Sequence, residues 1–535
     1  MIDQEMRSQP TNRYLYLCVF IGGMCTLAIE LSASRLLGNV FGTSNIVWAN
    51  VIGLILLYLT VGYFVGGRWS DHSPYPQTFY RIIIWSAFLS ALIPLVSRPV
   101  LRTAATAMAT ANAGVAGGSF ISVLILFSIP VILLGCLSPF AIRLAVTDLG
   151  SSGRVSGAIY GISTLGSLVG TFVPVLFLIP ELGTTLTFLL FAALLFVVGI
   201  LGLLRTTGAK SLIWLWMPIV ILTIYFIVRS GPLRAPFPGL ILLYESESPY
   251  NYIQVQEDVS GTRYLFLNEG QGIHSQWNST NYGDGNRTWS FFLTAPYFNT
   301  PPFMTSDVDS LAIIGLAAGT IARQYSYVYG DIPIDGIEID PGIVEAGSRF
   351  FDMNPVKMPN LNVLIEDGRY ALNRLGRDYS VIVVDAYRPP YIPWHLTTVE
   401  FFYEVKSSLQ SDGVLAINVG RTPSDRRLVD AMASTLLEVF PSVHAMDVPN
   451  SFNTILVATA LPSEATNLEA NLALMPSSIR PILRDALSVG ISSIVSLGVS
   501  DVVFTDDRAP LETLVDSLVI QFLLSGGVSD LVSAS

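Results

Sequence analysis

The sequence predicts a multi-pass α-helical membrane domain, followed by an α/β domain with a doubly wound sheet and a small β-unit at its start. Residues 14–229 are apolar almost throughout and hold few ionisable groups. From residue 311 on, apolar runs that end in Gly or a carboxylate alternate with helical patterns, as buried parallel strands do when their carboxyl ends line a crevice. We expect a transmembrane domain over 1–230, a Pro/Gly linker over 231–240, a small β domain over 241–300 and the main domain over 301–535.

The membrane part holds seven apolar segments of spanning or near-spanning length. They are residues 14–36, 46–66, 80–97, 119–141, 155–178, 184–204 and 211–229. In the fifth segment, Gly157 with Gly161 and Gly166 with Gly170 form small-xxx-small pairs, which predict close packing between helices.

Two charges, Glu30 and Arg35, lie at the end of the first span, where charges are costly and are usually paired or functional. One interpretation is a pair at the interface or with a neighbouring helix. The other is a polar path for a substrate, and the sequence leaves both open.

The composition limits the partners. A hydrophobic fraction of 51% with 13% charged residues indicates a bilayer as partner, and a net charge of −11 argues against nucleic acid. An acidic protein suits cationic substrates such as amines better. The three cysteines (Cys18, Cys25 and Cys136) lie in apolar stretches and the four histidines show no ligand spacing, so we expect no metal site.

The second part of the chain first shows three alternating segments, residues 240–246, 252–258 and 262–269, which predict an antiparallel β-unit. Strands of the main sheet are expected near 311–315, 334–339, 361–366, 380–385, 413–419, 443–448 and 454–460. Helices are expected near 320–329, 341–351, 368–376, 397–411 and 425–439. This alternation predicts a doubly wound parallel sheet.

Glycines and acids mark one edge of that sheet. Gly315 and Gly319 bound the first strand-to-helix turn, where glycine permits close approach of a ligand. Glu338 ends the second strand and suits ribose hydroxyls. Asp340 follows it, Asp367 with Gly368 ends the third strand, and Asp385 ends the fourth. Three successive acidic strand ends predict a site for a nucleoside-bearing cofactor.

Two motifs before the sheet carry a resemblance. They are Tyr250-Asn-Tyr-Ile253-Gln-Val255 and Leu265-Phe-Leu-Asn268-Glu-Gly270. With the acidic strand ends, they make residues 243–460 resemble the polyamine aminopropyltransferases, the spermidine synthase family, within the methyltransferase-like (Rossmann-like) folds. With the membrane part, the whole chain looks like the membrane-fused spermidine synthase-like proteins.

The resemblance implies roles for single residues. Glu338 would hold the ribose of decarboxylated S-adenosylmethionine, Asp367 with Gly368 its adenine, and Asp385 would orient and deprotonate the attacking amine. Further cofactor contacts would come from Asn251, Gly315, Gly319 and Asp340, and substrate contacts from Tyr250, Tyr387 and Arg388. Aminopropyltransferases often pair, so a homodimer is expected.

The chain departs from the family where the amine would bind. The family's Asp-x-x-Asp appears as Asp385-Ala-Tyr-Arg388, and its Tyr-His-Glu as Trp289-Ser-Phe291. An Arg repels a protonated diamine and attracts a carboxylate, either that of intact S-adenosylmethionine or that of an acidic acceptor. The alternative is an Arg that faces solvent or a surface acid.

Other residues near these motifs allow two interpretations each. The aromatic loop 387–395, with Tyr387, Tyr391 and Trp394, would either cap the pocket or serve packing. His274 and His395 fit a structural role better than a place in the pocket. Asp506 with Asp507 is predicted to cap a following helix.

We therefore expect a membrane-bound aminopropyltransferase-like enzyme that releases 5′-methylthioadenosine. The alternatives are a transferase or lyase that uses intact S-adenosylmethionine, or a transporter or sensor whose soluble domain only binds a nucleoside or polyamine. Lys and Arg residues fall eight to five on the two sides of seven spans, which mildly favours an external soluble domain. A nucleoside cofactor argues for a cell-membrane protein with that domain in the cytoplasm, and we give it more weight.

Overall fold

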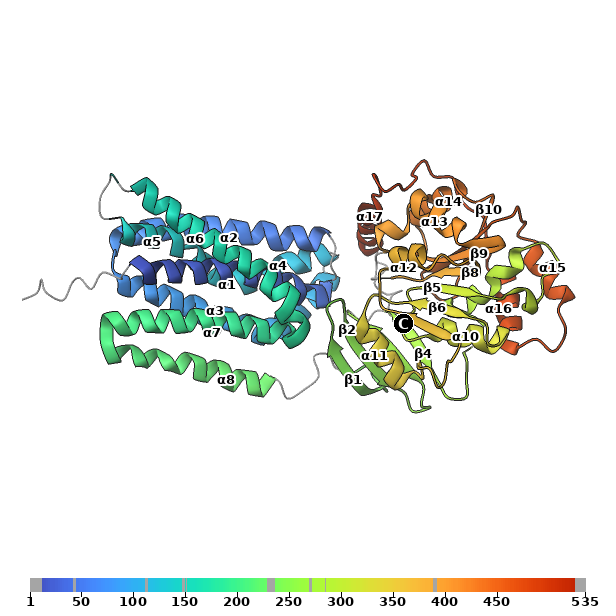
Figure 1. Ribbon diagram of the computed structural model, residues 1–535, viewed down its shortest axis with the longest axis horizontal. Coiled ribbons are helices and arrows are strands. Elements are labelled where there is room, and N and C mark those ends of the chain that lie inside the picture. The colour runs from blue at the N-terminus through green and yellow to red at the C-terminus, as the bar shows by residue number, and fades with distance from the viewer. Residues whose placement is uncertain are drawn as a thin grey trace, which may run out of the picture. The chain divides into compact units, whose positions relative to one another are not determined.

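The computed structural model describes residues 12–41, 45–110, 114–146, 150, 152–228, 236–268, 272–283, 285–387 and 392–524. The chain divides into two compact units, Met1–Arg234 (unit 1) and Ala235–Ser535 (unit 2). The boundary between them falls inside the Pro/Gly stretch. Each unit is described by itself (Figure 1).

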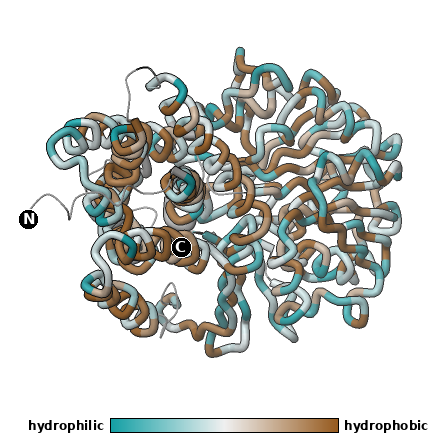
Figure 2. The backbone as a smooth tube through the Cα atoms, turned by 60° about the vertical axis from the view of Figure 1, so that its left-hand side comes forward, coloured by the Kyte–Doolittle hydropathy of each residue, from teal (hydrophilic) through white to brown (hydrophobic). Residues whose placement is uncertain are grey.

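Nearly all described residues of unit 1 are helical, apart from short connections such as residues 73–75. Its elements are α1 (Asn12–Phe41), α2 (Asn45–His72), α3 (Pro76–Thr110), α4 (Gly114–Gly135), α5 (Leu137–Ala145), α6 (Ser152–Val173), the π-helical turn η2 (Pro174–Leu178), α7 (Ile179–Thr207), the 3-10 segment η3 (Gly208–Leu215) and α8 (Trp216–Val228). Figure 2 colours these helices brown over much of their length, as expected for apolar sequence.

Five described helical segments are long and apolar enough to cross a membrane, judged by length and composition. They are Arg13–Gly38, Ile46–His72, Pro76–Ser97, Gly117–Ala145 and Ser152–Ile227. The last has 76 residues, about 114 Å of straight helix, against a hydrocarbon core of about 30 Å. The segment is not one straight helix: η2 separates α6 from α7, the backbone turns at Gly183 (φ 79°) near the start of α7, and it turns again at Gly208 (φ 64°), where η3 leads into α8.

Glycine permits very close packing of α6 on α1. A Cβ added at Gly166 would lie 2.0 Å from the carbonyl oxygen of Phe20, and one at Gly170 would lie 2.0 Å from that of Met24. The second predicted pair of small residues therefore lies in a helix interface, as expected. The first pair differs, because an added Cβ at Gly157 or Gly161 would meet nothing within 4 Å.

Unit 2 begins with a four-stranded antiparallel sheet, in the order β1-β2-β3-β4. Its strands are β1 (Ile241–Glu247), β2 (Tyr252–Glu257), β3 (Arg263–Leu267) and β4 (Ile273–Trp277). The predicted β-unit is present, with a fourth strand added. Its inner face packs on α11 (Pro341–Phe350), because Ile253, Val255 and Leu265 share a buried cluster with Ile343 and Ala346.

The main sheet has eight strands, in the order β12-β10-β11-β9-β8-β5-β6-β7. They are β5 (Leu311–Ile314), β6 (Ile334–Ile337), β7 (Leu361–Leu364), β8 (Tyr379–Val384), β9 (Leu409–Gly420), β10 (Ser442–Asp447), β11 (Asn453–Thr459) and β12 (Ile494–Val495). The five strands β5 to β9 are parallel, as predicted. The strands β10, β11 and β12 pair antiparallel, because a short turn between β10 and β11 leaves no room for a crossover helix.

Helices cover both faces of this sheet, so the predicted fold class is confirmed. Ala312 and Ile314 of β5 face one core, and Leu311 and Ile313 face the other. The first core contains α12 (Gly368–Leu375), α13 (Val399–Ser407), α14 (Arg427–Leu437) and α17 (Leu511–Leu524). The second contains α9 (Thr288–Phe291), η4 (Phe292–Phe298), α10 (Thr320–Tyr329), α15 (Asn467–Leu474) and α16 (Pro481–Ser492).

We predict that Gly315→Ala disrupts the end of β5. Gly315 has φ +90°, and an added Cβ would lie 2.5 Å from the carbonyl oxygen of Asp385. Strain and overpacking together should cost about 2–4 kcal/mol. Hydrogen exchange of the full-length protein should show β5 losing protection. Gly376→Ala is the matched control, since Gly376 also has positive φ but nothing within 4 Å, and it should cost about 1–2 kcal/mol. Equal protection of β5 in both variants would contradict the prediction.

Candidate active site

The turn after β5 is built around the Glu338 carboxylate. Gly315 donates its backbone N–H to the carbonyl of Ile337, and Ala317 donates its own to Oε2 of Glu338 at 2.9 Å. Oε1 of Glu338 accepts the N–H of Asp340 at 3.1 Å. A carboxylate has about four acceptor positions, so these two bonds fix Glu338 and leave acceptor capacity for two hydroxyl groups.

Burial also changes the charge state of this acid. Glu338 is 7% exposed, and burial raises its pKa to about 7, although N–H donors from Asp340 and Ala317 act in the opposite direction. No described Lys or Arg forms an ion pair with it within 4 Å. Glu338 is therefore only partly ionised at neutral pH.

Asp340 links the small sheet to the main domain. It is fully buried, and its Oδ1 accepts the N–H of Gly342 at 2.9 Å, which caps α11. Its Oδ2 accepts the hydroxyl of Ser248 at 2.6 Å and the amide of Asn251 at 2.8 Å. Asn251 also accepts from Asn268 at 2.8 Å. These bonds give Asp340 and Asn251 structural partners, and their predicted contact with a cofactor stays a prediction.

Asp367 and Gly368 begin α12 at the end of β7. Oδ1 of Asp367 accepts the N–H groups of Arg369 and Tyr370, both at 3.1 Å. Gly368 is required here, because an added Cβ would lie 2.3 Å from Cγ2 of Ile314. The cap therefore sits directly against the end of β5.

The other oxygen of Asp367 has a partner that the sequence did not reveal. Oδ2 lies 2.9 Å from Nε2 of His395. Burial acts to raise the pKa of Asp367, but hydrogen bonds from the Tyr370 N–H and from His395 outweigh it and hold the pKa below its usual value. His395 is thus a contact of the predicted adenine-binding acid.

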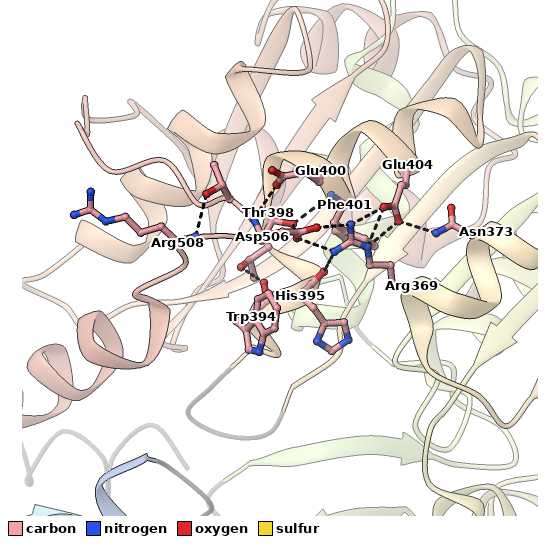
Figure 3. Close-up of polar contacts among 12 residues, drawn as sticks. Arg369, Asn373, Trp394, His395, Thr398, Glu400, Phe401, Glu404, Asp506 and Arg508 are labelled. Carbon is pink, nitrogen blue, oxygen red and sulfur yellow. Dashed lines mark hydrogen bonds and ion pairs between the residues drawn. The ribbon is translucent and has the colours of Figure 1, made fainter.

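A cluster of charged and polar side chains around Arg369 stabilises the first turn of α12 (Figure 3). Arg369 donates three hydrogen bonds to Glu404, at 2.6, 2.8 and 3.0 Å, and two to Asp506, at 2.8 and 2.9 Å. Asp506 also accepts the hydroxyl of Thr398 at 2.7 Å. The prediction that Asp506 caps the following helix is wrong, because its carboxylate is occupied by this bidentate pairing with Arg369.

Asp385 lies between β8 and the loop that follows. Its backbone N–H binds the carbonyl of Ile314 at 2.8 Å, and its Oδ1 accepts the side-chain amide of Asn418, on β9, at 2.9 Å. Burial raises the pKa of Asp385 to about 6, with the Asn418 bond acting against the rise. A carboxylate of that pKa is ionised at pH 7 and still basic enough to accept a proton.

Two further polar atoms near Asp385 have no hydrogen-bond partner in the described part of the chain. They are Oδ1 of Asn418 and the hydroxyl of Tyr387. The Tyr387 hydroxyl lies beside Gly420, where an added Cβ would come within 3.1 Å. Asn418 is 6% exposed, so an unpaired oxygen there is costly unless a ligand donor meets it.

Several residues that the sequence predicted for the site make none of the contacts described above. Arg388 and Tyr391 lie outside the described residues. Tyr250 is 38% exposed and precedes β2. Trp289 is buried in α9. His274 is on β4, where burial lowers its pKa to about 4 and so keeps the ring neutral. No group of three or more His, Cys, Asp or Glu that could hold a metal occurs among the described residues.

Comparison with known proteins gives a family match for the part of unit 2 that contains the acidic strand ends. Residues 304–465, which contain the ends of β5 to β9, match the family model of the spermine/spermidine synthase domain. This stretch of the chain is therefore similar to a spermine/spermidine synthase domain. Glu338, Asp367, Asp385 and Asn418 all belong to it, and the resemblance stated from the sequence is confirmed.

Relatives of the synthase domain agree. The chain is 30% identical over 291 residues to a probable polyamine aminopropyl transferase of Bifidobacterium longum, which covers 51% of this chain and 62% of the relative. It thus spans about three fifths of that relative's length. A polyamine aminopropyltransferase of Aquifex aeolicus is 21% identical over 434 residues, 79% of this chain and 82% of the relative. That stretch exceeds the length of unit 2, so it includes part of unit 1.

A solved structure shows a weaker likeness. It is a probable spermidine synthase from Corynebacterium glutamicum, with 20% identity and a TM-score of 0.37 over 50% of this chain and 99% of the other. A likeness at this level supports no argument about the site.

The raised pKa of Glu338 predicts a pH dependence of stability. Its pKa lies above the ordinary value in the folded protein, so the associated stability is present below about pH 4.5 and is lost as pH rises through about 7. Glu338→Gln should flatten this decline. The decline is measured as the change in the urea midpoint of unit 2 between pH 5 and pH 8. The full chain is solubilised in detergent, and unfolding is detected by proteolysis. The exposed Glu469→Gln is the control and should leave the decline as in the unchanged protein. A decline that persists in Glu338→Gln would refute the assignment.

Proposed function

We propose that the protein is a membrane-bound aminopropyltransferase-like enzyme. It transfers an aminopropyl group from decarboxylated S-adenosylmethionine to an amine and releases 5′-methylthioadenosine. The observation that carries this proposal is the Asp385 carboxylate, which has a pKa of about 6 and a single described side-chain hydrogen bond, to Asn418. It lies inside the stretch that is similar to a spermine/spermidine synthase domain, next to strand ends that carry Glu338 and Asp367.

The adenosyl part of the co-substrate would lie along this edge. Glu338 has acceptor positions left for the two ribose hydroxyls, and its backbone bonds hold it in place. Asp367 would accept from the adenine amine beside Gly368. Gly315 and Gly319, at the two ends of the turn, have no side chain that would obstruct a nucleoside.

The chemistry is a displacement at carbon. The amine nitrogen forms a bond to the carbon next to the sulfonium, and the carbon–sulfur bond breaks with its electron pair going to sulfur. The nitrogen loses a proton, which the Asp385 carboxylate accepts and passes to water. The unpaired Oδ1 of Asn418 and the Asp385 carboxylate would orient the amine N–H groups, which supplies the alignment that such a displacement needs.

A second candidate uses intact S-adenosylmethionine. It rests on Arg388, which stands where the family has its second acid and would bind a carboxylate. Isothermal titration of the full chain with the two co-substrates separates the candidates. Preference for the carboxylated form would refute the first. The third candidate, a transporter or sensor with a binding domain, would require co-substrate binding without any methylthioadenosine from amine mixtures.

We propose further that unit 1 spans the cell membrane and that unit 2 faces the cytoplasm, where its nucleoside co-substrate occurs. The five apolar helical segments support the first part. A homodimer remains a proposal from the resemblance.

Asp385→Asn should reduce turnover by about 10²–10⁴-fold, because the amide cannot accept the proton. Affinity for the co-substrate should stay within about twofold. Methylthioadenosine release and titration calorimetry measure the two quantities. Asp378→Asn, an exposed acid just before the same strand, is the matched control and should leave turnover unchanged. Undiminished turnover in Asp385→Asn would exclude the catalytic role.

Asn418→Leu should move the acidic limb of the pH profile upward. The hydrogen bond from Asn418 favours the ionised form of Asp385, so its loss raises the pKa above about 6. The kcat/KM profile should therefore begin to rise at higher pH than in the unchanged protein. Asn418→Gln, which retains an amide donor, should restore part of the shift. An unchanged limb in Asn418→Leu would show that this bond does not tune Asp385.

A further inference from the structure

Unit 1 encloses a small cavity between four of its helical segments. Its volume is about 70 Å³. The lining comes from α1 (Val19, Gly22, Gly23, Thr26, Leu27), α2 (Leu59, Tyr63), α4 and α5 (Leu134, Gly135, Leu137, Ser138) and α6 (Ser163, Ser167). The α1 and α2 residues lie in the central part of their apolar segments, and Ser163 and Ser167 lie near the middle of α6. The cavity therefore lies at the depth where polar groups are most costly.

The polar lining presents oxygen acceptors. Thr26 donates its hydroxyl hydrogen to the carbonyl of Gly22 at 2.8 Å, and Ser167 donates to that of Gly23 at 3.2 Å. The first bond lies within α1 and the second joins α6 to α1, so both hydroxyl hydrogens are used and the lone pairs of the two oxygens remain. Three more residues that carry a hydroxyl group, Tyr63, Ser138 and Ser163, line the same cavity.

A backbone carbonyl adds to this set. In a helix the carbonyl of Gly135 would accept the N–H of residue 139, but Pro139 has none. The break between α4 and α5 falls here, so Gly135 contributes an acceptor without its usual helical donor. Helix ends of this kind, at membrane depth, coordinate cations in transport proteins.

The negative charge lies one helical turn away. Glu30 follows Thr26 by four residues and Leu27 by three, which places it on the cavity face of α1. It is partly buried, and it forms no hydrogen bond or ion pair with the residues that the structure describes. A carboxylate in an apolar span without a partner indicates a functional site.

We propose that this cavity and Glu30 form an intramembrane site for a short aliphatic diamine. One ammonium group occupies the cavity, where its three N–H donors meet the hydroxyl and carbonyl oxygens. The second lies at Glu30, about one turn or 5.4 Å along α1.

The mixed lining distinguishes this ligand from a metal ion. Five apolar side chains (Val19, Leu27, Leu59, Leu134 and Leu137) share the cavity with the oxygens. Methylene groups pack well against such walls, whereas a bare ion would face them without ligands. The choice of a diamine as ligand rests on the proposed function of unit 2, whose substrate is an amine. The acceptor lining and the charge are independent of that function.

The test is binding of radiolabelled 1,4-diaminobutane to the full chain in neutral-lipid nanodiscs. All proteins carry Asp385→Asn, so turnover by unit 2 does not enter the result. Glu30→Gln should weaken binding at least tenfold. Thr26→Val keeps the side-chain shape and removes an oxygen, and should weaken it about three- to tenfold. Glu181→Gln, an exposed acid of the same unit, should leave it unchanged.

Two other probes examine the geometry. Butylamine has one ammonium group, so its binding should respond to Thr26→Val and change less than threefold in Glu30→Gln. Displacement of the diamine by Na⁺ at equal concentration would overturn the proposal in favour of an ion site, and so would equal diamine binding in Glu30→Gln and Glu181→Gln. Folding is checked by the buried free thiols Cys18, Cys25 and Cys136, which should stay unreactive to maleimide in every variant. The function of unit 2 is tested separately, in the protein that retains Asp385. If that protein forms no methylthioadenosine, the function proposed for unit 2 is refuted, and the diamine binding measured in unit 1 is unaffected.

Discussion

Close packing at the carboxyl end of β5 is the constraint on which the site of unit 2 depends. An added Cβ at Gly315 would lie 2.5 Å from the carbonyl oxygen of Asp385, and one at Gly368 would lie 2.3 Å from Cγ2 of Ile314. The chain at Asp367 and at Asp385 therefore lies against the end of β5. Glu338 is held at the same strand end, because its carboxylate accepts the N–H of Ala317 in the turn after β5.

Burial then gives the acids different chemistry. Glu338 and Asp385 lose solvent without gaining a described cation, and the pKa of each rises. Asp367 keeps backbone donors and His395, and its pKa falls. The same edge of the sheet therefore holds one acid fixed as an anion and two that respond to pH near neutrality.

The sequence predicted what depends on local pattern. Apolar runs and turn residues located both sheets, the helical unit and the acidic strand ends, because these follow from periodicity and from glycine and carboxylate at fixed places. It did not reveal Asn418, which looks like any polar residue within a strand. It also missed the role of Asp506, since Arg369 lies 137 residues away and only the tertiary fold brings them together. The antiparallel strands β10 and β11 were found as strands, but their direction depends on the connection between them.

The pairing of Arg369 with Asp506 has a consequence for where the functional module ends. Asp506 lies beyond residues 304–465, the stretch that matches the family model, yet it supports the helix start that carries Asp367. A fragment cut at the border of the matched stretch would keep Glu338, Asp367 and Asp385 and lose an ion pair that supports the start of α12. A fragment that retains this pair must therefore extend past residue 506.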